Sequence, residues 1–182
     1  MCGSYASSNV GPPASAEDGR SRHNGNVLGN VLIGLAAFVV MEPVTALLHR
    51  YLFHGRVGYT LHRSHHVAGS GRWEANDLYP VLLAAVTIVA IWLGVSVGSL
   101  RFLAPIGAGV TAYGAAYAFV HDVYIHRRLP ILPAKVRLLE PLREGHRIHH
   151  LYSGAPYGML LPVVPAVLRR RAGRTELDPL VR

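Results

Sequence analysis

Three long apolar runs divide the chain: Val27–Leu48, Tyr79–Val97 and Phe102–Val120. As a helix, the first run reaches roughly 33 Å at about 1.5 Å per residue, which is enough to cross a hydrocarbon core about 30 Å thick. Only Gly98–Arg101 separate the second and third runs, so these two predict an antiparallel helical hairpin. The pattern predicts an all-α, multi-pass membrane helical bundle with three spans. A fourth span near residues 155–168 stays open, because prolines interrupt that region.

The two ends of the chain have a different composition. Residues 1–26 are rich in Ser, Gly, Ala and Asn and have no hydrophobic period, which predicts a disordered N-terminal tail. The stretch 169–182 begins with three arginines and predicts a solvated, basic C-terminal tail. The expected organisation is therefore a tail over 1–26, a membrane domain over 27–168 and a basic tail over 169–182.

The formal charge of +8 comes from 18 Lys and Arg against 10 Asp and Glu. The basic residues flank the apolar runs instead of alternating with aromatic residues on a soluble face, so nucleic-acid binding is not expected. Most of them lie in the loop after the first run and in the segment after the third, which the positive-inside rule places in the cytoplasm. Cys2 is the only cysteine, so any bound metal needs imidazole or carboxylate ligands.

Histidine is the residue type that carries the candidate chemistry. Of eleven histidines, all but His23 fall into four clusters, each next to the expected cytoplasmic end of a span or in a cytoplasmic segment. The clusters are His49 with His54, then His62, His65 and His66, then His121 with His126, and last His146, His149 and His150. We expect these ten side chains to meet on one side of the membrane.

The spacing within the clusters differs in its geometric meaning. Residues at i, i+3 and i+4 share one helix face, so the second and fourth clusters each present three imidazoles together. Five residues turn by about 140° on a regular helix. His49 and His54 therefore cannot bind one ion on a regular helix. They could serve two different ions, and so could His121 and His126.

Ten imidazoles exceed the four ligands that one zinc ion takes. They suit two metal ions with about five ligands each and positions left open. Imidazole ligands that leave coordination positions of the metal open fit redox iron, although imidazole alone also suits zinc and copper.

Four polar residues are candidates for orienting these histidines from behind. Glu42 is an acid inside an apolar run, seven residues before His49 and nearly on the same helix face. It could orient His49 or simply remain hydrated near the surface. Asn76 and Asp77 begin the second span and could cap that helix or contact a histidine. Asp122 could orient a neighbouring histidine of the third cluster.

The four histidine boxes, in this order around these spans, resemble those of the bacterial β-carotene hydroxylases in the membrane fatty-acid hydroxylase superfamily. The segments Trp73–Tyr79 and Gly107–Gly114 are similar to that family as well. The resemblance covers about residues 30–165. It implies that all ten histidines hold two iron ions, that O2 is a co-substrate, and that C3 of a carotenoid β-ionone ring is hydroxylated. It also implies a ferredoxin with its reductase as electron donor, and a substrate that enters from the lipid.

Two other readings remain open. A hydroxylase or desaturase of a sterol or fatty acyl chain shares the chemistry and the superfamily. A membrane metal-binding or transport protein could use the histidines as a relay, but Glu42 is the only acid in the three apolar runs. That scarcity of ionisable groups along the spans argues against transport.

Overall fold

The computed structural model describes residues 14–67 and 73–180, with side chains from Asn26 onwards. Every regular element in these ranges is helical, which confirms the all-α prediction. The long helices are α1 (Ala14–Leu48), α3 (Leu78–Ser96) and α4 (Leu103–Ala118). The shorter ones are α2 (Tyr59–His66), α5 (Glu140–Tyr152) and α6 (Ala166–Ala172). Two π-helical turns, η1 (His49–Phe53) and η4 (Phe119–Ile125), continue α1 and α4. Two 3-10 turns are η2 (Ala75–Asp77) and η3 (Gly98–Leu100).

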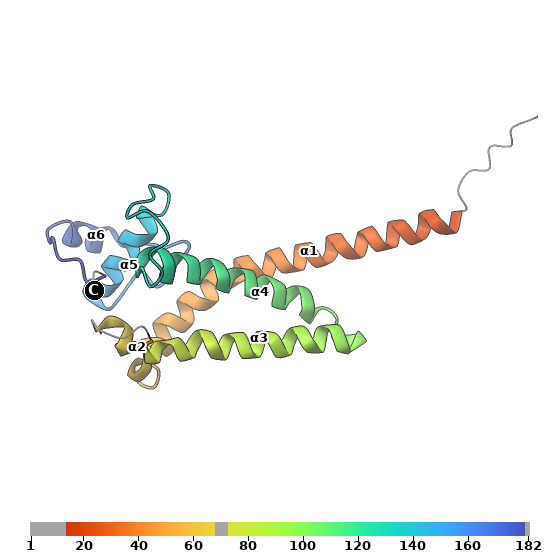
Figure 1. Ribbon diagram of the computed structural model, residues 1–182, viewed down its shortest axis with the longest axis horizontal. Coiled ribbons are helices and arrows are strands. Elements are labelled where there is room, and N and C mark those ends of the chain that lie inside the picture. The colour runs from red at the N-terminus through yellow and green to blue at the C-terminus, as the bar shows by residue number, and fades with distance from the viewer. Residues whose placement is uncertain (1–13, 68–72, 181–182) are drawn as a thin grey trace, which may run out of the picture.

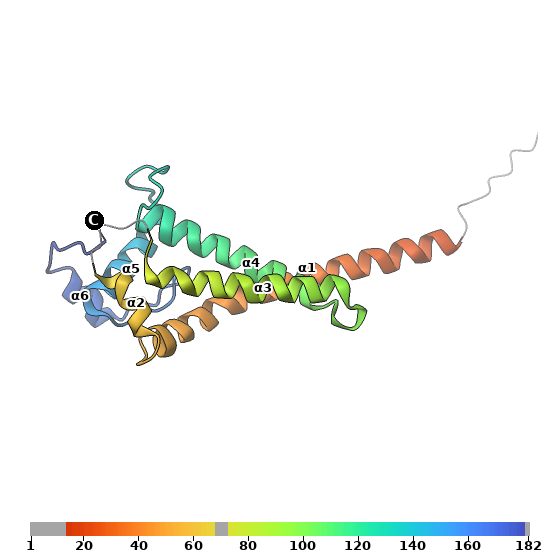
Figure 2. The same ribbon diagram turned by 60° about the horizontal axis from the view of Figure 1, so that its bottom comes forward.

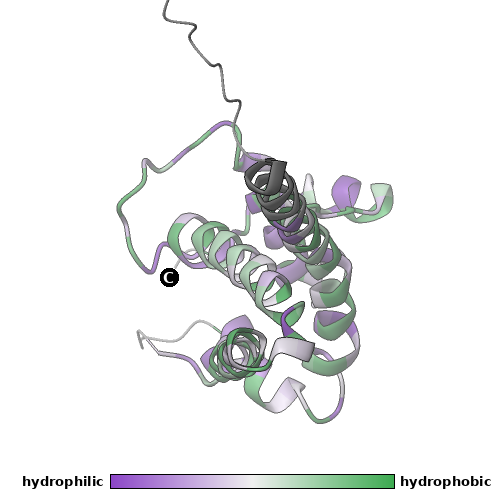
Figure 3. Ribbon diagram, turned by 90° about the vertical axis from the view of Figure 1, so that its right-hand side faces the viewer, coloured by the Kyte–Doolittle hydropathy of each residue, from purple (hydrophilic) through white to green (hydrophobic). Residues whose placement is uncertain are grey.

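Three stretches are long and apolar enough to cross a membrane: Asn26–Phe53, Ala75–Ser96 and Leu103–Ile125. Their outward side chains are exposed, as Val39 at 66%, Val86 at 67% and Trp92 at 61% illustrate. Figure 3 looks along the spans and shows hydrophobic positions around the helices α3 and α4. Such a surface requires lipid, so the predicted three-span bundle is confirmed. No fourth span occurs in the described part of the chain, because residues 155–165 form no helix and α6 has 7 residues.

Close helix contacts hold the bundle together. A Cβ added to Gly109 of α4 would lie 2.1 Å from the carbonyl oxygen of Gly34 in α1. A Cβ added to Gly94 of α3 would lie 2.4 Å from the backbone nitrogen of Ala104 in α4. Small residues thus let both α1 and α3 approach α4, as is usual where apolar burial cannot drive helix association. The histidine-bearing turns that follow α1 and α4 then lie at the same end of the molecule, where α3 begins (Figure 1).

Helices α2, α5 and α6 gather at that end, which both Figure 1 and Figure 2 show. We call it the histidine end. The short helix α2 carries the second histidine cluster and α5 carries the fourth. The first and third clusters lie at the two π-helical turns. The fold therefore brings all four clusters together, as the sequence predicts.

The N-terminal boundary differs from the prediction. Helix α1 begins at Ala14, inside the range 1–26 that we expected to be a disordered tail. The physical reason is cooperativity: once the apolar span is helical, each added residue costs little. Residues 1–13 lie outside the described part of the chain.

The segment from Arg169 onwards, which we predicted to be a solvated basic tail, contacts the rest of the chain. Ala172 is fully buried, and Leu180 belongs to an apolar cluster with Val120, Tyr124, Ile125 and Met159. Arg147 of α5 donates hydrogen bonds to the carbonyl oxygens of Leu177 and Ala172, 2.9 and 3.3 Å away. Arg143 pairs with Asp178. A few apolar residues between the charged ones are sufficient to dock this segment. The overall composition of the segment, which is dominated by arginine, does not reveal them.

Candidate metal centre

The π-helical turns change how the first and third clusters are arranged. The backbone nitrogen of His54 donates to the carbonyl oxygen of His49 at 3.0 Å, and that of His126 donates to His121 at 2.8 Å. These are i→i+5 bonds, so the residue five positions on lies about one turn further along, on the same face. The ring centroids are 5.1 Å apart in the first pair and 4.6 Å in the second. The possibility that the members of each pair serve different ions assumed a regular α-helix, whereas the π-helical turns place the two rings of each pair next to each other.

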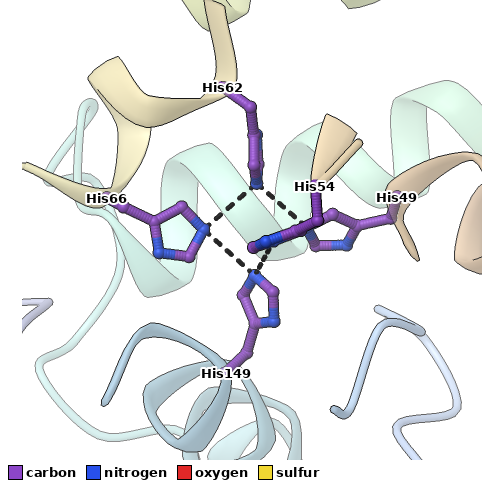
Figure 4. Close-up of side chains that lie close together, drawn as sticks. All are labelled: His49, His54, His62, His66 and His149. Atoms are coloured by element: carbon purple, nitrogen blue, oxygen red, sulfur yellow. Dashed lines mark hydrogen bonds between the residues drawn. The ribbon is translucent and has the colours of Figure 1, made fainter. Parts of the chain in front are cut away.

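Five histidines form the first group, drawn in Figure 4: His49, His54, His62, His66 and His149. They come from the start of η1, from the residue after η1, from α2 and from α5, and all point towards one centre. Each offers one nitrogen, and these five nitrogens lie within 4.8 Å of one another. Neighbouring Nε2 atoms are 3.1 to 3.2 Å apart.

The second group lies beside the first. It contains His65, His126, His146 and His150, whose nitrogens also lie within 4.8 Å of one another. His121 adjoins this group, with its Nε2 3.0 Å from Nε2 of His65. The histidines of α2 divide between the two groups, and so do those of α5. One face of each helix therefore supplies ligands to both groups. The rings of His66 and His150 stack across the boundary with centroids 4.4 Å apart.

The protonation of these rings supports a cation at each centre. His49 and His62 point Nδ1 at the carbonyl oxygen of Tyr157 (3.0 Å) and at Oδ1 of Asn76 (2.7 Å). These oxygens can only accept, so in the neutral rings the proton is on Nδ1 and Nε2 carries a lone pair. The two Nε2 atoms nevertheless face each other at 3.1 Å. Only a positive ion between them turns this repulsion into binding.

The spacing also fits the size of such an ion. Nitrogens about 2.1 Å from a metal and about 90° apart lie about 3.0 Å from each other. The Nε2 contacts within the second group, from 2.9 to 3.1 Å, match this value as closely as those of the first. The two histidine clusters are therefore consistent with a di-metal site with about five imidazoles for each ion.

Burial keeps the histidines neutral, as metal ligands must be. Desolvation, followed by the charges of neighbouring histidines, lowers the pKa of His66 to about 3. Desolvation likewise lowers the pKa of His62 to about 4, partly opposed by the hydrogen bond to Asn76. The pKa values of further ring nitrogens in both groups are lowered for the same first cause, namely those of His54, His65, His126, His146, His149 and His150.

The structure places two of the four orienting candidates against histidines. Oδ1 of Asn76 accepts from Nδ1 of His62, and Oδ1 of Asp122 lies 3.1 Å from Nδ1 of His121. Asp77 contacts no histidine among the side chains that the structure describes. Its Oδ2 accepts from the backbone nitrogen of Glu74 at 2.9 Å, so it caps the turn η2.

Glu42 is not the partner of His49, so that alternative is wrong. Its carboxylate accepts from the backbone nitrogens of Leu160 and Leu161 and from the hydroxyl of Tyr113, at 2.7 to 3.2 Å. Seven residues of helix separate Glu42 and His49 by about 10 Å, and helical side chains lean towards the N-terminus, away from His49. Glu42 instead fixes the loop that carries Tyr157.

Two functional candidates escaped the sequence reasoning. Oε2 of Glu74 lies 3.0 Å from Nδ1 of His65, in the place expected for a residue that orients a ligand. Arg128 contacts Glu74 and Asp77 at 2.8 Å and Asp122 at 3.3 Å. Glu74 could have been identified from the sequence, because it is an acidic residue only nine positions after His65 of the second cluster. Nothing local distinguishes Arg128 from other basic residues near a membrane surface.

An apolar cavity of about 340 Å³ leads from the spans to both groups. Its walls come from α1, η1, α3 and α4, with Leu48, Phe53, Leu83 and Ala118 among them. Its inner end is lined by histidines of both groups, namely His49, His62, His65, His121 and His146. The cavity can hold an apolar group next to the metal centre.

The fold and the site define a membrane-spanning protein with a histidine-rich centre for two metal ions. A family model described as fatty acid hydroxylase matches residues 34–168, and the chain belongs to that family. Beta-carotene hydroxylase of Pantoea ananas is 42% identical over 154 residues, which cover 79% of this chain and 86% of the relative. Beta-carotene hydroxylase of Pseudescherichia vulneris is 37% identical over 159 residues, covering 81% and 88%.

Plant and algal relatives are longer. The chloroplastic Beta-carotene 3-hydroxylase of Haematococcus lacustris is 38% identical over 160 residues, and the chain spans 48% of its length. No solved structure matches the chain.

Proposed function

We propose that this chain is a membrane di-iron monooxygenase that hydroxylates C3 of the β-ionone rings of carotenoids. Acting on both ends, it converts β-carotene to β-cryptoxanthin and then to zeaxanthin. The observation that carries the proposal is the apolar cavity that ends at histidines of both groups. The similarity to the bacterial relatives named beta-carotene hydroxylase supports the choice of substrate.

The donor set supports the choice of iron. Nine histidines form two groups of five and four, and His121 adjoins the second. With His121 as a fifth ligand there, each ion would have five imidazoles, which exceed the four ligands usual for zinc. Two iron ions held there supply the redox chemistry with O2 that cleavage of an unactivated C–H bond requires. One oxygen atom forms the hydroxyl group and the other leaves as water, so each hydroxylation needs two electrons and two protons from a donor.

The protein's own contribution is binding and orientation. Leu48, Phe53, Leu83 and Ala118 give the ring an apolar seat that excludes water. The walls of the cavity include residues of the span helices, and we propose that the rest of the carotenoid remains in the lipid. Asn76 and the carbonyl oxygen of Tyr157 hold the protons of His62 and His49 on Nδ1, which keeps Nε2 of each ring directed at the centre.

The electron donor we propose is a ferredoxin with its reductase on the cytoplasmic side, where the positive-inside rule puts the histidine end. The exposed arginines of the C-terminal segment are complementary to an acidic carrier, and α6 packs on α5, which bears three of the ten histidines. The arginines are Arg169, Arg170, Arg171 and Arg174.

Purified protein in lipid nanodiscs, loaded with iron and supplied with ferredoxin, its reductase, NADPH and O2, tests the proposal. We expect singly and then doubly hydroxylated carotenoid from β-carotene. Oxidation of a sterol or a fatty acyl chain, with β-carotene unchanged, would instead favour a sterol or lipid hydroxylase or desaturase of the same superfamily.

A cavity variant links the product to the site. Ala118→Phe fills the cavity and should lower turnover at least tenfold while leaving the iron content unchanged. Ala115→Phe is the matched control, because Ala115 is exposed on the same helix and does not line the cavity. Equal activity of Ala118→Phe and the unaltered protein would place the substrate elsewhere.

A further inference from the structure

The two groups of histidines differ in what lies behind the ligand nitrogens. In the first group, Nδ1 of His49, His62 and His149 faces uncharged oxygens: two backbone carbonyls and the amide of Asn76, at 2.5 to 3.0 Å. In the second group, Nδ1 of His65 faces the carboxylate of Glu74 at 3.0 Å. Nδ1 of His121, which adjoins this group, faces the carboxylate of Asp122 at 3.1 Å. Within the described ranges, no carboxylate contacts a ring nitrogen of the first group.

Arg128 ties this anionic surrounding together. Its side chain is 14% exposed, and its guanidinium contacts the carboxylates of Glu74, Asp77 and Asp122. The backbone nitrogen of Arg128 also donates to the carbonyl oxygen of Asp122 at 2.8 Å. One cation therefore holds both orienting carboxylates in place.

The chemical consequence follows from how an imidazole transmits charge. A carboxylate that accepts the Nδ1 proton makes the opposite nitrogen a stronger donor than an amide or a carbonyl oxygen does. A carboxylate directly behind a ligand also attracts a divalent cation, and low exposure strengthens that attraction. The first group has neither advantage, although both groups offer about the same number of nitrogens at the same spacing.

We propose that the two metal sites are electrostatically inequivalent, and that the site of the second group binds its iron more tightly and fills first. Glu74 and Asp122 are positioning residues that act through His65 and His121, and Arg128 fixes both. This inference rests on the proposed di-iron centre.

Stepwise loading tests the inference. Metal-free protein in detergent is titrated with ⁵⁷Fe²⁺ without oxygen, and each addition is examined by Mössbauer spectroscopy and by competition with a chelator. We expect one quadrupole doublet up to one equivalent of iron, followed by a second doublet, and two dissociation constants at least tenfold apart. Two doublets that grow together from the first addition, with a single dissociation constant, would overturn the inference.

Glu74→Gln tests the role of charge apart from structure. Glutamine keeps an oxygen for His65 and for Arg128 but removes the negative charge. We expect the affinity of the tighter site to fall by about 10- to 100-fold, so that the first equivalent of iron divides between the two sites. Unchanged affinities and order of filling in this variant would also overturn the inference.

Asn76 offers matched comparisons on the other group. Asn76→Ala removes the uncharged acceptor of His62, so it should weaken the looser site only and keep the order of filling. Asn76→Asp gives that site a carboxylate and should narrow the gap between the two constants. If the folded, unaltered protein binds no iron at all, the proposed di-iron function fails together with this inference. Two irons bound with equal affinity overturn the inference alone.

Discussion

The π-helical turn between His49 and His54 leads to an unusual prediction about chain length. Removing one residue from this turn should preserve the first metal site, whereas adding one should destroy it. In the observed turn, His54 lies on the face of His49 through an i→i+5 hydrogen bond. Deletion of Tyr51 makes the spacing i+4, which an ordinary α-helix also places on one face. Tyr51 is 65% exposed, so little packing is lost with it.

The effect of an insertion follows from helix geometry. One extra alanine after Tyr51 rotates His54 by about 100°, and a side chain about 5–6 Å from the helix axis then moves by about 8 Å. The nitrogens of the first group lie within 4.8 Å of one another, so a displaced His54 cannot reach the others. Affinity for the ion at the first group should fall by at least an order of magnitude.

The assay is the iron content of the purified, reconstituted variants, with size-exclusion chromatography as the check on folding. We expect two irons in the deletion variant and one in the insertion variant. Tyr51→Ala, which keeps the length, should bind two. Loss of iron from the deletion variant together with retention in the insertion variant would refute the role that we give to the π-turn.

Three further predictions concern packing, pH and the donor. Gly109→Ala should destabilise the protein by about 1–3 kcal/mol in thermal unfolding, because its Cβ would strike the backbone of α1, whereas Gly29→Ala, with nothing within 4 Å, should not. The pKa of His62 is lowered to about 4, so between about pH 6.5 and 4 the unfolded chain binds the extra proton. The metal-free protein should lose stability as the pH falls through that window, and a melting temperature that rises on acidification would contradict this. Ferredoxin-driven turnover should fall with ionic strength and in a triple Arg→Gln variant of α6, while turnover with reduced methyl viologen stays unchanged. An equal loss with both donors would remove α6 from the proposed docking surface.

Much of the fold could be predicted because its signals are local. Span length and apolar character determine the three membrane helices, and the short Gly98–Arg101 connection determines the α3–α4 hairpin. The clustering of histidines next to span ends was sufficient to place them at one end of the bundle. These inferences need no knowledge of distant contacts.

The remaining features depend on contacts that spacing does not encode. The sequence separation of His49 and His54 is the same in an α-helix and in a π-turn. The α-helix, however, would place the two side chains on different faces, whereas the π-turn places them on the same face. Arg128 and Asp77 are 51 positions apart, and only the folded chain brings them together. The C-terminal segment docks through Ala172 and Leu180, whose apolar signal is weak among arginines.

The central claim is carotenoid hydroxylation at the histidine centre, and pigment analysis tests it most directly. Bacteria that accumulate β-carotene are compared with and without this chain, and with a His149→Ala variant shown to be present in the membrane. His149 contacts both His54 and His66 through Nε2, so its removal opens the first group. We predict β-cryptoxanthin and zeaxanthin only with the unaltered chain. Unchanged β-carotene, with the unaltered protein in the membrane and loaded with iron, would contradict the account.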